Sequence, residues 1–121
     1  MKRENIVYDK AYQFAIEIVK VYRYLVTESK EFILARQLLR SGTSIGANIS
    51  EANGAISKAD FSNKISLAYK ECLETKYWIS LLKDSNIISP NTYQKIYPEA
   101  DEIGKILFAI LRTTRIQKSK S

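Results

Sequence analysis

Residues 61 to 82 read FSNKISLAYKECLETKYWISLL, and this stretch decides the fold. Apolar or small side chains recur along it at alternating spacings of four and three. They are Phe61, Ile65, Ala68, Cys72, Thr75, Ile79 and Leu82. This alternation puts them on one stripe of an α-helix, whereas a strand would show a period of two. The pattern is typical of a helix that packs lengthwise in a bundle.

Polar residues that cap helices mark where this helix and the next one begin. Ser57 and Asp60 have the spacing of a capping box, so we expect a helix over about 58–84. Ser89 before Pro90 is a good N-cap with proline in the first turn, which predicts a helix over about 90–115. We expect only a local kink at Pro98 and a disordered tail at 117–121.

The first half of the chain contains two more periodic segments, over about 7–28 and about 31–55. In the second of them, Gly42 and Gly46 lower the helix propensity, and propensity alone would place a loop there. Ile45 and Ala52 nevertheless keep the helical phase across the glycines. We therefore predict a continuous helix whose small residues allow a neighbouring backbone to approach closely.

Four such helices with short connections favour antiparallel packing of neighbours. The prediction is one all-α domain over residues 1–121, an antiparallel up-down-up-down four-helix bundle. A single cysteine and no signal-like apolar run near Met1 indicate a cytoplasmic protein. Charged residues interrupt every apolar stretch, which predicts no membrane span.

The residue types present disfavour an enzyme. The chain has no histidine, which is the commonest general base and metal ligand. Cys72 lies on the apolar seam, and the residues after Gly46 do not complete a phosphate-binding loop. Glu17, Glu51, Glu71 and Glu74 are expected to pair with lysine or arginine. We therefore assign no catalytic, metal or cofactor site.

The third helix carries more apolar residues than one seam requires. The additional ones are Leu67, Tyr69, Leu73, Tyr77, Trp78 and Leu81. They favour a surface for self-association, although a wide core stripe with scattered exposed aromatics gives the same pattern.

Basic residues supply the best binding hypothesis, because the formal net charge is +6. Arg36 and Arg40 lie one helical turn apart, and Arg112, Arg115 and Lys118 advance by threes near the C-terminus. Clustered cations are what phosphate contacts need, although solvated basic residues are common and no standard nucleic-acid motif is present.

The segment QLLRSGTSIGANISEA, residues 37–52, resembles the bacterial four-helix-bundle family known from open reading frames in intervening sequences of 23S rRNA genes. KISLAYKECLETKYWISLL, residues 64–82, is similar to the third helix of that family. The matching motif residues are Arg40, Ser41, Gly42, Ser44, Gly46, Asn48, Glu51, Ala52, Glu71, Glu74, Thr75, Tyr77 and Trp78. The resemblance implies a bundle commonly assembled as a homopentamer, with no catalytic residues. A related protein, the accessory protein of diversity-generating retroelements, binds reverse transcriptase and nucleic acid.

Two functions follow as hypotheses. The first is a non-enzymatic, oligomeric nucleic-acid-associated protein that binds RNA or DNA through Arg36, Arg40, Arg112, Arg115 and Lys118. The alternative is a protein adaptor, for example a partner of a reverse transcriptase, without direct nucleic-acid binding.

Overall fold

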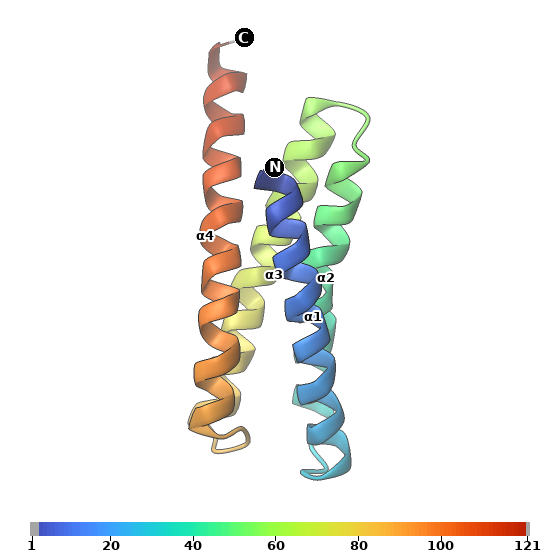
Figure 1. Cartoon of the computed structure of the whole chain (residues 1–121), viewed down its shortest axis with the longest axis vertical. Helices are drawn as coiled ribbons and strands as arrows, with labels where there is room; N and C mark the ends of the chain where they lie inside the picture. Colours follow the sequence, from blue (N-terminus) through green and yellow to red (C-terminus); the bar gives the residue numbers. More distant parts are fainter. Residues whose placement is uncertain (1–2, 121) are drawn as a thin grey trace.

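The computed structural model describes the backbone of residues 3–120 and the side chains of residues 5–114. Its elements are α1 (Arg3–Thr27), α2 (Ile33–Asn53), α3 (Lys58–Asp84) and α4 (Pro90–Lys120), with no strand between residues 3 and 120. Successive helices run in opposite directions along the bundle (Figure 1). The structure confirms the predicted all-α four-helix bundle.

Side-chain caps and left-handed turn residues explain why these helices begin and end where they do. The Ser57 hydroxyl accepts the Asp60 backbone N–H at 3.0 Å, and Ser89 accepts that of Thr92 at 3.1 Å. Lys30 and Asn86 take positive φ angles of 56° and 62° in the turns after α1 and α3. The two predicted N-caps are therefore confirmed.

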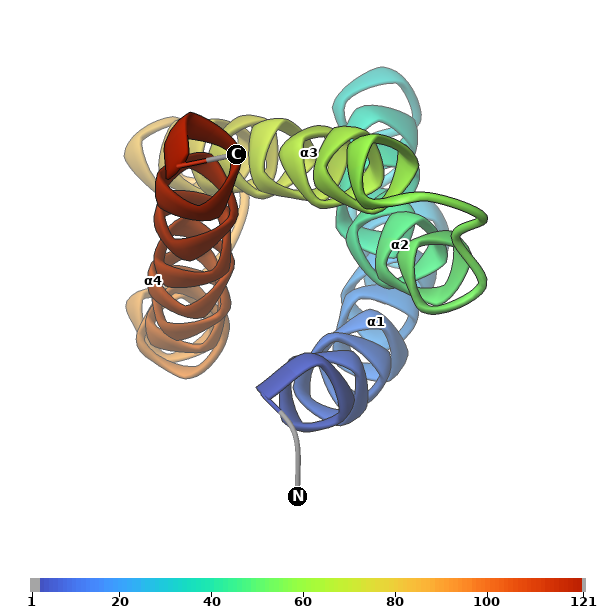
Figure 2. The same cartoon turned by 90° about the horizontal axis from the view of Figure 1, so that it is seen from above.

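The helices stand around the bundle in chain order (Figure 2), so that α1 and α3 each pack beside α2 and α4. The predicted seam of α3 is buried from Ile65 to Leu82. Its counterparts on the other helices include Phe14, Leu38 and Leu107, which are fully buried. One hydrophobic core therefore runs the length of the bundle.

Two glycines let α2 pack closely on α1, and α2 is continuous through both of them. A Cβ built on Gly42 would lie 3.0 Å from Cγ2 of Ile18, and one on Gly46 would lie 3.7 Å from the Cβ and carbonyl carbon of Ala11. The prediction of a continuous helix with a close backbone approach is confirmed, because burial of Ile45 and Ile49 holds the segment helical.

Helix α4 is longer than the sequence predicted. It continues through Pro98 and reaches Lys120, past the expected end at Arg115 and into the expected tail at 117–121. No glycine or proline follows Gly104, so no residue in this segment interrupts the backbone ladder. The last residue of that tail, Ser121, lies outside the described residues.

Candidate nucleic-acid interface

The predicted binding residue Arg40 is held by acidic side chains of α3. Its guanidinium forms an ion pair with Glu74, and its Nη1 lies 3.3 Å from Oε2 of Glu71. Gln37 accepts hydrogen bonds from Arg40 within α2, and the Trp78 indole N–H donates to Glu74 at 2.9 Å. This network joins α2 to α3 along the outside of the bundle.

The predicted binding residue Arg40 therefore has two carboxylate partners, and its side chain is 48% exposed. Sequence spacing could not show this, since Glu71 and Glu74 approach Arg40 only through the pairing of two helices. The prediction that the acids pair with cations is confirmed here. It holds also for Glu17 with Lys20 and Lys95, and for Glu51 with Lys64.

The other predicted cations are distributed over two separate helices. Arg36 is exposed on α2 and has no ion pair with any side chain between residues 5 and 114. Arg112 is exposed on α4. Helices α2 and α4 are not neighbours in the bundle, so these two residues do not form one patch. The side chains of Arg115 and Lys118 lie outside the described residues, although both positions belong to helix α4.

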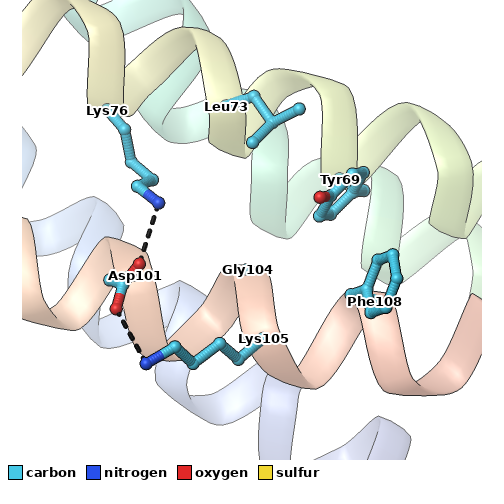
Figure 3. Close-up of a pocket in the computed structure, with 7 residues that line it drawn as sticks. All are labelled: Tyr69, Leu73, Lys76, Asp101, Gly104, Lys105 and Phe108. Carbon is cyan, nitrogen blue, oxygen red and sulfur yellow. Dashed lines mark hydrogen bonds and ion pairs between the residues drawn. The ribbon is translucent and has the colours of Figure 1, made fainter.

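A cleft with a volume of about 290 Å³ lies between α3 and α4. Its walls combine aromatic, aliphatic and charged side chains (Figure 3). The lining residues are Tyr69, Leu73, Lys76, Asp101, Gly104, Lys105 and Phe108. A Cβ on Gly104 would lie 3.3 Å from the Cys72 Sγ, so this glycine lets α4 approach α3 beneath the cleft.

Two lysines share one carboxylate at one end of the cleft. Asp101 lies 2.8 Å from Nζ of Lys76 and 3.2 Å from Nζ of Lys105, as Figure 3 shows. The hydrogen bond from Lys76, followed by that from Lys105, lowers the pKa of Asp101, and the same bond to Asp101 raises the pKa of Lys76. Both groups are ionised at neutral pH, so this end of the cleft carries an excess of one positive charge.

Two aromatic rings form the other end of the cleft. The rings of Tyr69 and Phe108 are tilted with centroids 5.9 Å apart, and Phe108 is 47% exposed. Sequence analysis identified Tyr69 and Leu73 as extra apolar residues of the third helix but did not connect them with α4. The available signal was the spacing of Lys105, Phe108 and Arg112, which are three and four residues apart and so lie on one face of the helix.

The single cysteine is part of the core. The Cys72 Sγ is fully buried and lies 3.1 Å from the Ala100 carbonyl oxygen. Burial raises the pKa of this thiol to about 11, so it stays protonated at neutral pH and is a poor nucleophile. Asn48, one of the family motif residues, donates to the Ser44 carbonyl of its own helix at 2.9 Å.

The fold and these surfaces define a small helical bundle with one strongly basic helix and a cleft beside it. The family model for the 23S rRNA-intervening sequence protein matches residues 3–109. The chain belongs to the 23S rRNA-intervening sequence protein family, as the sequence resemblance indicated.

A similar solved structure is the crystal structure, at 1.70 Å resolution, of a protein of unknown function from the S23 ribosomal protein family of Bacteroides thetaiotaomicron VPI-5482. It is 48% identical to this chain with a TM-score of 0.89, and the match covers 92% of this chain and 99% of the other. A search of the curated proteins finds no match. None of the helices between residues 3 and 120 is long and apolar enough to cross a membrane.

Proposed function

We propose that this chain is a non-enzymatic, nucleic-acid-associated protein that binds RNA or DNA through the outer face of α4. The observation that carries the proposal is the charge of this helix. From Lys105 onward α4 contains no acidic residue, and its cations are Lys105, Arg112, Arg115, Lys118 and Lys120. A helix with charges of a single sign attracts a polyanion.

The other properties of the chain agree with binding without catalysis. There is no histidine, and the thiol of Cys72 is buried and protonated. The description of the family, 23S rRNA-intervening sequence protein, supports a role connected with RNA. Arg36 and Arg40 remain secondary candidates on α2, and Arg40 differs from Arg36 in being paired with Glu71 and Glu74.

The proposal is tested by measuring the affinity for short RNA and DNA, single-stranded and duplex, over a series of salt concentrations. We expect binding whose logarithm falls linearly with the logarithm of the salt concentration. The variant Arg112→Gln should weaken binding to all of these ligands more than Lys20→Gln does, because Lys20 is paired with Glu17. Absence of binding at low salt would overturn the proposal.

Exposed apolar side chains support a second role, contact with another protein. Tyr77 is 60% exposed on α3, and Tyr12 and Tyr24 are similarly exposed on α1, outside the α3–α4 cleft. We propose that the chain self-associates, and the family resemblance suggests a homopentamer. A reverse transcriptase is a further candidate partner. Light scattering on the purified chain tests self-association, and a monomeric mass across micromolar concentrations would contradict it.

A further inference from the structure

The outer face of α4 alternates basic and aromatic side chains beside the α3–α4 cleft. Lys105, Phe108 and Arg112 follow one another at spacings of three and four, and therefore extend over about 10 Å of helix. The Lys105 side chain is 79% exposed, and Arg112 is also exposed. Phe108 lies between these two cations in the sequence of α4. It forms a wall of the cleft (Figure 3).

The size and lining of the cleft suit one flat, apolar group. Its volume of about 290 Å³ is at the small end of the range for ligand sites, about 300–1,000 Å³. The exposed part of Phe108 and the tilted ring of Tyr69 offer aromatic surface, and Leu73 adds an aliphatic contact. A planar ring system that entered here would stack on an aromatic side chain already fixed by its neighbours.

The charged side chains around the apolar surface of the cleft favour a polyanionic ligand. Lys76 and Lys105 carry two positive charges against the single carboxylate of Asp101, and Arg112 adds a third cation one turn beyond Phe108. The centre of a protein–protein interface is normally depleted of charged residues, especially lysine. Here lysines form part of the cleft wall itself, which favours a ligand that combines apolar rings with closely spaced negative charges.

We propose that the α3–α4 cleft binds single-stranded nucleic acid. One unpaired base enters the cleft and stacks on Phe108 and Tyr69, while the neighbouring phosphates contact Lys105 and Arg112. This inference rests on the proposed nucleic-acid role and specifies its ligand. A duplex has no free base to insert and can use only the cations, so the cleft gives a preference for single strands.

The first experiment isolates the contribution of the base. Fluorescence anisotropy measures the affinity for a labelled oligo(dT) and for an abasic oligonucleotide of equal length and therefore equal charge. We expect the wild-type chain to bind oligo(dT) about 5- to 100-fold more tightly, since one stacked base contributes a factor of this size. Phe108→Leu should abolish most of this preference, whereas Tyr24→Leu, at an exposed aromatic residue of α1, should retain it.

Phe108→Trp gives a direct readout of stacking that does not depend on affinity. Its added fluorescence should be quenched by oligo(dT) and not by the abasic strand. Unchanged fluorescence at saturating oligo(dT) would overturn the proposal even if Phe108→Leu folded poorly. Equal affinity of the wild-type chain for both oligonucleotides, with salt-dependent binding retained, would also overturn it while leaving the proposed function intact.

A variant of Asp101 tests whether the cleft lysines Lys76 and Lys105 bind phosphate or only hold the two helices together. Asp101→Asn removes the one carboxylate of the cleft but leaves both lysines, so we expect severalfold tighter binding of oligo(dT). Unchanged or weaker binding in a folded variant would contradict phosphate contact at Lys105. If Phe108→Leu changed the oligomer mass but not the oligonucleotide affinity, the cleft would be a protein-docking surface, and the proposal would be wrong.

Discussion

At the residue scale, the two glycines of α2 face different amounts of space. The Cβ of an alanine at position 42 would come within 3.0 and 3.1 Å of two carbons of Ile18, which is fully buried and would have to shift. At position 46 the nearest atoms belong to Ala11 at 3.7 Å, an ordinary van der Waals distance. The same substitution should therefore have opposite effects one turn apart.

We expect Gly42→Ala to lower the free energy of unfolding by about 1–2 kcal/mol through overpacking, despite the better helix propensity of alanine. Gly46→Ala should raise it by up to about 1 kcal/mol, because the propensity gain meets no clash. Urea unfolding followed by the fluorescence of Trp78, the only tryptophan, measures both. Equal effects of the two variants on the free energy of unfolding would show that the close contact with Ile18 does not destabilise Gly42→Ala.

Replacement of Arg40 should affect stability more than replacement of Arg36, because Arg40 has ion-pair partners. Arg40→Gln would leave the carboxylates of Glu71 and Glu74 facing each other without a cation, so we expect a destabilisation of about 1 kcal/mol. Arg36→Gln, one turn away and exposed, should change the free energy of unfolding by less than about 0.5 kcal/mol. Urea midpoints measured under identical conditions compare them, and a larger loss for Arg36→Gln would refute the assignment.

At the element scale, two ion pairs join α1 to α4. Glu17 lies 2.9 Å from Nζ of Lys95, and Lys10 lies 2.8 Å from Glu102. The Lys95 ammonium, with a smaller effect of Lys20, lowers the pKa of Glu17 below its ordinary value of 4.5. A lowered acid pKa means that this contribution to stability is fully present above about pH 4.5 and disappears as the pH falls through the folded-state pKa. Burial raises the pKa of Glu99, which lies on α4. Protonation of Glu99 as the pH falls therefore stabilises the folded state, opposite to the effect of protonating Glu17.

We therefore predict that Glu17→Gln flattens the decrease in stability between pH 6 and pH 3, because the variant has no carboxylate to protonate at this position. Glu99→Gln should make the same decrease steeper, since it removes the compensating gain. Thermal unfolding by circular dichroism across this pH range measures both slopes. Parallel profiles for the two variants and the wild-type chain would show that neither carboxyl group controls acid stability.

Helix identities could be predicted from the chain, but contacts between helices could not. The heptad stripe from Phe61 to Leu82 and the caps at Ser57 and Ser89 are local patterns, and the structure reproduces them. The ion pairs of Arg40 depend on which residues of α3 lie opposite it. A single sequence does not show which residues of two packed helices face each other. The cleft was missed for the same reason, because Tyr69 and Leu73 come from α3 and Phe108 from α4.

At the scale of the whole molecule, positive charge is concentrated at one end of one helix. All 13 acidic residues lie before Ile103, and seven of them form ion pairs with lysine or arginine between residues 5 and 114. The last stretch of α4 carries cations alone. Figure 1 shows the C-terminal end of α4 extending beyond the start of α1. The net charge of +6 therefore acts mainly from one end of the bundle.

Removal of residues 115–121 tests whether location or total charge governs nucleic-acid binding. The deletion takes away Arg115, Lys118 and Lys120, so the net charge falls from +6 to +3, while the buried residues Ile110 and Leu111 remain. Replacement of Lys20, Arg23 and Lys30 by glutamine also gives +3 but spares α4, because these exposed cations lie on α1 and in the turn after it. For single strands, each lost phosphate contact lowers the slope of log affinity against log salt by about 0.7. We expect the deletion to reduce this slope by up to about 2 and the second variant to leave it nearly unchanged, because α1 ends at the opposite end of the bundle from the C-terminus of α4 (Figure 1). Equal losses in both proteins would mean that net charge, and not the basic end of α4, attracts the nucleic acid.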